Sequence, residues 1–178
     1  HVGIKLLEKL IPLNVQWLAI TDVSLSNKPD LLRMLYRAGC REVLLGFESL
    51  NAEHLRRLES KNWKSRRVKD YQSCIHEIKK TGIMVRGAFI LGFDEQTPEE
   101  FQLLKRFIGD NKIMAQFSVL TPVPGSKLYS KYKKASRLRK DRTWKHYNFL
   151  DCVFKHPTMT AEELEKTAAD LFSFTFSA

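Results

Sequence analysis

The sequence has few cysteines and no long apolar run, and these two absences exclude several classes of protein. Cys40, Cys74 and Cys152 are far apart in the chain, so they form neither a metal-ligand spacing nor a disulfide framework. The longest apolar runs, such as residues 88–93, are much shorter than the roughly 20 residues that span a bilayer. The first residues show no secretory leader. We therefore expect a cytoplasmic protein with reduced thiols and no membrane partner.

Acidic residues are also scarce relative to basic ones. Lys and Arg number 30 against 20 Asp and Glu, which makes the net charge +10. Such a surface can bind nucleic acid or another polyanion, or it can be solvated without any partner. The stretches at 63–67 and 131–142 mix basic and aromatic residues, but no RNA-binding motif accompanies them. We expect no nucleic-acid partner.

The hydrophobic pattern alternates between strand and helix. The predicted helices span 4–10, 29–38, 65–81 and 97–108, and the predicted strands span 15–21, 42–47, 83–93 and 115–120. This alternation implies crossover connections and a parallel sheet. The segment 127–144 is basic and poorly periodic, and a further helix begins after Thr160.

Turn and capping residues mark several boundaries of these elements. Asn51 can cap a short helix that contains His54, and Thr97 with Glu100 forms the pattern of a capping box. Thr160 with Glu163 repeats that pattern. Gly109 is the expected end of the helix that Thr97 opens.

Three acidic residues each follow the apolar run of a predicted strand: Asp22, Glu48 and Asp94. In parallel α/β folds the carboxyl ends of the strands share one face, and that face carries the ligand. Carboxylates there could accept hydrogen bonds from ribose hydroxyls, hold an ammonium group or bind a metal. The alternative is that these residues simply begin polar loops. Gly46 and Gly92 have two interpretations as well, namely close approach by a ligand or a neighbouring backbone, or a bulge or bend in the strand.

Three segments together resemble the radical SAM superfamily, most closely the branch that often carries an N-terminal cobalamin-binding domain. They read AGCREVLLGFESLNAEHLRRLESK, YQSCIHEIKKTGIMVRGAFILGFDEQTPEEF and VLTPVPGSKLYSKY. The resemblance implies an α/β fold that is a partial TIM-like (β/α) barrel, here with about four parallel strands, flanking helices and a C-terminal helical extension. Residues 1–126 would form the C-terminal portion of the barrel, and residues 127–178 a basic linker and helical extension that pack on it.

The family's chemistry uses a 4Fe–4S cluster held by three cysteines of a CxxxCxxC loop. Reductive cleavage of S-adenosylmethionine produces a 5′-deoxyadenosyl radical that abstracts hydrogen from the substrate. This sequence lacks the cluster loop, so we expect no metal site in the chain. We interpret it as part of a longer iron–sulfur oxidoreductase or transferase, inactive when isolated, with cobalamin possible in the parent.

Seven residues carry over from the resemblance as contacts to S-adenosylmethionine: Asp22, Glu48, Ser49, Lys61, Phe89, Leu91 and Asp94. Asp22 would lie near the ribose, and Glu48 and Ser49 would contact the ribose or the methionine moiety. Lys61, with Arg57 as the alternative, would pair with the methionine carboxylate. Phe89 and Leu91 would pack near adenine, although barrel core is an equal interpretation for both.

Partners and competing functions follow from the same resemblance. A small-molecule substrate would be bound with the help of the missing N-terminal part, and unpaired sheet edges could produce a homodimer. One alternative function is a non-catalytic barrel that binds S-adenosylmethionine, a nucleotide or RNA. Another is an ordinary barrel enzyme that uses the three strand-end acids as acid–base or metal groups.

Overall fold

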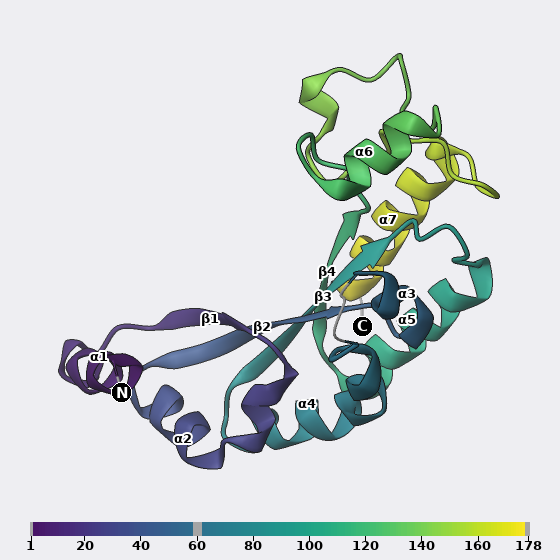
Figure 1. The fold of residues 1–178 in the computed structure, drawn as a ribbon. Helices are drawn as coiled ribbons and strands as arrows, with labels where there is room; N and C mark the ends of the chain where they lie inside the picture. Colours follow the sequence, from purple (N-terminus) through teal and green to yellow (C-terminus); the bar gives the residue numbers. More distant parts are fainter. Residues whose placement is uncertain (1, 59–61, 177–178) are drawn as a thin grey trace. The chain divides into compact units, whose positions relative to one another are not determined.

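The computed structural model describes residues 2–58 and 62–176 and shows alternating strands and helices (Figure 1). The helices are α1 Val2–Leu10, α2 Pro29–Arg37, α3 Ala52–Leu58, α4 Tyr71–Lys79, α5 Pro98–Asn111, α6 Lys127–Lys134 and α7 Ala161–Thr175. The strands are β1 Trp17–Thr21, β2 Cys40–Glu48, β3 Met84–Leu91 and β4 Met114–Val119. Short 3-10 helices are η1 Ile11–Leu13, η2 Val23–Asn27, η3 Ser65–Asp70 and η4 Trp144–His146.

The four strands form one parallel sheet in the order β1-β2-β3-β4. In the first pair Ile20 lies opposite Leu44 and Thr21 opposite Leu45. Sequential strands that pair in parallel with helices between them are the repeating unit of a β/α barrel. The predicted α/β fold, a partial TIM-like barrel with four parallel strands and flanking helices, is therefore confirmed.

The chain divides into two compact units. The first contains His1–Ala88 and Ile108–Ala115, and the second contains Phe89–Phe107 and Gln116–Ala178. The predicted domain boundary between residues 126 and 127 stays a prediction.

In the first unit, α2 and α4 lie along one side of β1 and β2 (Figure 1). Alternate residues of β2 face these helices, namely Val43, Leu45 and Phe47, and all three are fully buried. Tyr71 at the start of α4 packs its ring on Phe47, with 4.5 Å between ring centroids, and donates a hydrogen bond of 3.0 Å to the Phe47 carbonyl. Burial of these side chains stabilises this unit.

The opposite face of the same strands is open. Ile20 is 79% exposed, and Leu18 and Met84 are exposed as well. Glu42 and Arg86 form an ion pair between β2 and β3 on this face. Dimer formation through the sheet edges stays a prediction.

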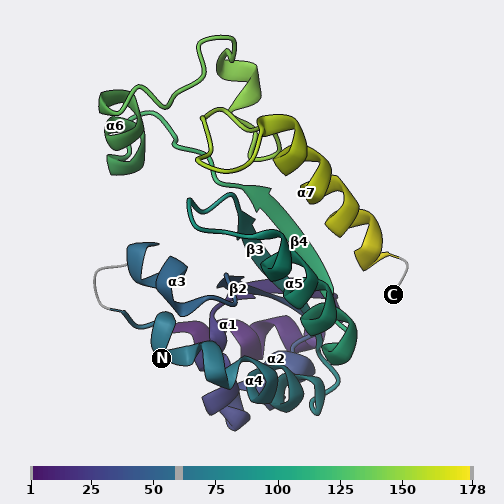
Figure 2. The same ribbon diagram turned by 90° about the vertical axis from the view of Figure 1, so that its right-hand side faces the viewer.

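The second unit holds the end of β3, most of β4, most of α5 (Pro98–Asn111) and the helices α6 and α7. Figure 2 shows α7 running beside α5 and β4. The Nζ atom of Lys105 on α5 lies 5.8 Å from the centre of the Phe174 ring on α7, and Leu164 and Leu171 of α7 are fully buried. The predicted capping box at the start of α7 is confirmed, since the Thr160 hydroxyl accepts from the Glu163 backbone and the Glu163 carboxylate accepts from the Thr160 backbone.

Two predicted helix boundaries are wrong. The helix expected over residues 65–81 is divided into η3 and α4, because Tyr71 is anchored to Phe47 and the turns before it wind as a 3-10 helix. The helix that was expected to end at Gly109 continues to Asn111. Ile108 is fully buried, so the helix continues past Gly109 with its apolar side packed on the protein. It ends before Lys112, which adopts a left-handed conformation with φ of 47°.

The segment after residue 126 is more regular than its composition predicts. Residues 127–134 form α6, whose N-terminus is capped by the Ser126 hydroxyl, which accepts from the Tyr129 backbone at 3.1 Å. Tyr132 is its single buried side chain and holds the helix against the unit. Among the helices that the structure describes, none has both the length and the apolar composition needed to cross a membrane.

Candidate functional site

Asp22 and Glu48 lie at the carboxyl ends of two adjacent strands and on the same face. Ile20 and Leu44 are opposite one another, so strand alternation brings Asp22 and Gly46 to that face two residues later. A Cβ atom built on Gly46 would lie 2.6 Å from Oε1 of Glu48, so the Glu48 side chain projects to this side too. These two carboxylates therefore lie at the same edge of the first unit, as their positions after two predicted strands indicated.

One oxygen of the Asp22 carboxylate is hydrogen-bonded to the backbone. Its Oδ1 atom accepts a hydrogen bond of 2.7 Å from the Ser24 backbone and so caps η2. Within the described residues, Oδ2 has no hydrogen-bond partner and can accept from a ligand hydroxyl or ammonium group.

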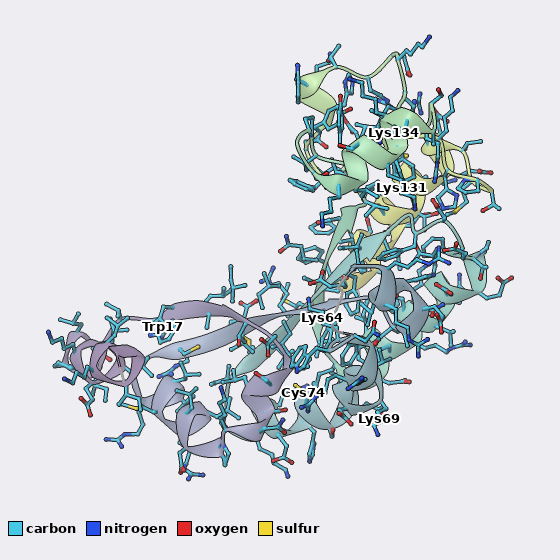
Figure 3. The ribbon with its side chains drawn as sticks, in the orientation of Figure 1. Trp17, Lys64, Lys69, Cys74, Lys131 and Lys134 are labelled. Atoms are coloured by element: carbon cyan, nitrogen blue, oxygen red, sulfur yellow. The ribbon has the colours of Figure 1, made fainter. Side chains whose placement is uncertain are left out.

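Glu48 is held by an ion pair with Lys64 that the sequence pattern did not predict. Its Oε1 atom lies 2.7 Å from Nζ of Lys64, and the two side chains are only 22% and 27% exposed. Lys64, labelled in Figure 3, reaches back to β2 from the segment between α3 and η3. Glu48 also has φ of 64°, a conformation that costs a non-glycine residue about 1–2 kcal/mol. The ion pair helps to hold the carboxylate in one orientation.

Gly46 provides the space in which this ion pair forms. A Cβ atom at position 46 would approach Glu48 Oε1 to 2.6 Å and Lys64 Nζ to 3.4 Å. Both atoms are the ends of flexible side chains, so they could move away at low cost. The groups nearest to Gly46 are therefore these two charged side chains, and the close approach of a ligand there stays a prediction.

Gly46→Ala is expected to separate Glu48 from Lys64 while changing the free energy of unfolding by less than about 1 kcal/mol. A double-mutant cycle with Glu48→Gln and Lys64→Gln measures the ion pair by urea denaturation. Its coupling energy should be about 0.5–1.5 kcal/mol with Gly46 present and close to zero in the Gly46→Ala background. Equal coupling energies in both backgrounds would show that Gly46 does not position the pair.

Ser49 belongs to a buried hydrogen-bonded group. Its hydroxyl accepts from the Asn51 backbone at 3.0 Å and lies 3.2 Å from Nδ1 of His54. Because the hydroxyl accepts from the Asn51 N–H group, its own hydrogen is available for Nδ1. Both Ser49 and His54 are buried. The group positions the start of α3 after β2, where Asn51 accepts from the Glu53 backbone as the predicted cap.

Asp94 lies in the second unit and is bound by the chain after α6. Arg137 contacts its two carboxylate oxygens at 2.7 and 2.6 Å, and the Tyr132 hydroxyl lies 3.2 Å from Oδ1. The hydrogen bonds and positive charge of Arg137 lower the pKa of Asp94. Burial and the adjacent Asp94 charge raise the pKa of Tyr132 to about 12. A site common to Asp94 and the other two acids stays a prediction.

The remaining predicted residues are core residues or lie outside the described part. Phe89 and Leu91 are buried, and the Phe89 ring packs against Phe107 and Phe117 at 6.3 and 6.0 Å between centroids. Any contact of theirs with adenine would therefore come from the backbone, and that contact stays a prediction. Lys61 lies outside the described residues.

The cysteines do not form a metal centre in the part of the chain that the structure describes. All three are buried and free, and burial raises the pKa of each thiol. No group of three His, Cys, Asp or Glu side chains among the described residues could hold a metal ion. These residues do not fit an iron–sulfur cluster.

Curated proteins with similar sequences are methyltransferases. The chain is 32% identical over 161 residues to bacteriochlorophyllide d C-12(1)-methyltransferase from Chlorobaculum tepidum, which covers 90% of this chain and 34% of that protein. It is 29% identical over 168 residues to an uncharacterized methyltransferase, PH0819, from Pyrococcus horikoshii, which covers 93% of this chain and 35% of the relative. The chain spans about a third of the length of these relatives. No family model matches the sequence.

Solved structures with the same fold include a radical S-adenosylmethionine enzyme. The methyltransferase TsrM from Kitasatospora setae, solved with cobalamin and a [4Fe-4S] cluster bound, matches 96% of this chain and 40% of its own with a TM-score of 0.65 and 15% identity. Methylornithine synthase (PylB) matches 96% of this chain and 43% of its own with a TM-score of 0.56 and 13% identity. These likenesses support the fold.

Proposed function

We propose that this chain is part of the catalytic barrel of a longer radical SAM methyltransferase and contributes to its S-adenosylmethionine-facing surface. The observation that carries the proposal is a double similarity. Methyltransferases resemble nearly the whole chain in sequence, and a radical SAM methyltransferase matches 96% of it in fold. Since the relatives are about three times as long, the proposal assigns the complete activity to a longer protein.

Carboxylates at the ends of β1 and β2 support an assignment of the polar part of S-adenosylmethionine to this edge of the sheet. Glu48 and Asp22 place carboxylate oxygens on the open face of the sheet, and Gly46 leaves room beside Glu48. Lys64 neutralises and orients one oxygen of Glu48, while Oε2 has no partner in the described part of the chain. In this proposal Glu48 and Asp22 accept hydrogen bonds from ribose hydroxyls or the methionine ammonium group. When bound, S-adenosylmethionine supplies the methyl group or the adenosyl radical.

The proposal places the iron–sulfur cluster outside this chain, because the described residues offer no cysteine group that could hold it. It follows that the isolated chain should not cleave S-adenosylmethionine. The transferase class is favoured over an oxidoreductase, because the curated relatives named above are methyltransferases.

Binding of S-adenosylmethionine tests the proposal without requiring turnover. By calorimetry we expect the chain to bind S-adenosylmethionine and Glu48→Gln to weaken binding at least tenfold, which corresponds to about 1.4 kcal/mol. Glu53→Gln is the matched control, since Glu53 is an exposed acid paired with Arg56 on α3. It should change the affinity less than twofold.

The same two substitutions in the full-length gene product extend the test to turnover. Glu48→Gln should reduce methyl transfer, and Glu53→Gln should not. Equal affinities of both variants and the wild type, or a full-length protein that binds no S-adenosylmethionine, would contradict the proposed function.

A further inference from the structure

The second unit contains a cavity that the proposed function does not use. Its volume is about 980 Å³, within the range of small-molecule sites. Its walls come from α6, from the segments 136–141 and 154–156, and from residues 159–161 at the beginning of α7. In Figure 1 these segments lie together, in green and yellow, around α6 and the first turns of α7.

Unpaired positive charge surrounds this cavity. Lys133, Lys140 and Lys155 line it, and within the described residues none of their ammonium groups pairs with a carboxylate. The surrounding chain is strongly basic, with ten Lys and Arg residues and two Asp residues between positions 127 and 155. An anion entering the cavity would therefore meet a positive potential.

Two acidic residues reduce this charge but do not cancel it. Asp141 is bound by Arg139 at 2.7 and 3.1 Å, and Glu162 lies 3.5 Å from the same guanidinium group. One arginine thus offsets one of the two carboxylates. With the three lysines, the cavity retains an excess of about two positive charges, which suits a dianion.

The interior of the cavity is apolar and held in shape. Its apolar lining residues are Leu138, Phe154, Met159 and Ala161. Leu138 and Phe154 form an antiparallel bridge, flanked by backbone hydrogen bonds from Arg139 to Val153 at 3.0 Å and from Lys155 to Arg137 at 2.7 Å. The Phe154 ring also packs on Tyr132, with centroids 5.2 Å apart. A cavity built on paired backbone is preorganised for a ligand.

His156 and the N-terminus of α7, which also border the cavity, already have hydrogen-bond partners within the protein. Nδ1 of His156 accepts from the Met159 backbone at 3.1 Å, and Nε2 lies 2.8 Å from the Phe93 carbonyl. Both ring nitrogens of His156 are thus occupied by backbone groups, with Nδ1 accepting and Nε2 donating. The N-terminus of α7 is closed by its own capping box. The lysines, and not the helix end, are the groups that would meet an anion.

From these observations we infer that the cavity binds an amphiphilic anion, a small molecule with an apolar ring system and a phosphate or carboxylate group. The ring would lie against Leu138 and Met159, which are only partly buried, and the acidic group would pair with Lys133, Lys140 and Lys155. Phe154 is buried beneath the cavity and offers no open face on which successive nucleotide bases could stack, which favours a small molecule over RNA. The inference does not depend on the proposed methyltransferase function.

A fluorescence titration with 1-naphthyl phosphate tests the inference. The triple variant K133Q/K140Q/K155Q should bind this probe at least tenfold more weakly than the wild type. The matched control is K127Q/K131Q/K134Q, which removes the same charge from positions of α6 that do not line the cavity. The control should change the affinity less than threefold. Thermal unfolding of both triple variants verifies that they are folded.

Further titrations distinguish the contribution of the ligand's ring to binding from the contribution of its charge. The probe 1-naphthoate should also bind, whereas inorganic phosphate should bind at least tenfold more weakly than naphthyl phosphate. Ser136→Glu places a negative charge at the rim without removing a lysine and should also weaken binding. Equal losses in the two triple variants would indicate a diffuse basic surface, as for RNA, and would overturn the inference. Binding of inorganic phosphate as tight as that of naphthyl phosphate would overturn it as well.

Discussion

Gly92→Ala is expected to lower the free energy of unfolding by about 2–5 kcal/mol. Gly92 has φ of 94°, which an alanine adopts only at a cost of about 1–2 kcal/mol. In addition, a Cβ atom there would lie 2.8 Å from Cδ2 of Leu164 and 3.4 Å from the Phe154 ring. Overpacking of a core typically adds about 1–3 kcal/mol. The group that approaches Gly92 is thus a side chain of α7 in the same unit, and the close approach of a ligand there stays a prediction.

Urea denaturation at neutral pH measures this effect, and Gly46→Ala is the control because the atoms near Gly46 can move. Leu164→Ala in the Gly92→Ala background should relieve the clash, so the double variant should be more stable than the sum of the two single effects by about 1 kcal/mol. Gly92→Ala with wild-type stability would mean that α7 does not pack on Gly92 as the structure shows.

Arg137→Gln is expected to reduce the free energy of unfolding by about 2–4 kcal/mol at pH 7. Arg137 contacts both oxygens of Asp94 and lies over the Tyr132 ring, with Cζ 4.2 Å from the centroid. Its removal leaves a partly buried carboxylate without its main partner. The substitution also loosens the chain after α6 from the end of β3.

The cost of Arg137→Gln should depend on pH. The folded state has a lowered pKa for Asp94, mainly because Arg137 hydrogen-bonds to the carboxylate. The resulting stabilisation is therefore complete above the unfolded pKa of about 4 and is lost as the pH falls through the lower folded pKa. Below about pH 4 the wild type and Arg137→Gln should thus approach one another in stability.

Urea denaturation at a series of pH values between 7 and 2.5 measures this convergence. Arg139→Gln is the control, because its partner Asp141 is 61% exposed and the pair should contribute much less. A difference between wild type and Arg137→Gln that is the same at pH 7 and pH 2.5 would show that the Asp94 charge is not the cause.

Two residues of the candidate site are predictable from the local sequence pattern, and two are not. Asp22 and Glu48 follow apolar runs whose length and composition predict strands, and parallel pairing then brings them to one edge. Lys64 and Arg137 could not be found in this way, since they are 16 and 43 residues from the acids that they bind. Lys64 and Arg137 reach these acids because the chain after α3 and after α6 folds back toward the strand ends. Hydrophobic periodicity does not predict the path of such connecting segments.

Local sequence patterns were sufficient for the α/β alternation, most element positions and the caps of α3 and α7, because hydrophobic periodicity and capping act over a few residues. Tertiary packing decided where η3 passes into α4, how far α5 extends and that a basic segment forms α6. It also decided that Glu48 pairs with Lys64, that Asp94 pairs with Arg137 and that three lysines surround one cavity. These features depend on contacts between distant parts of the chain, whose energies are set only when the folded backbone brings them together.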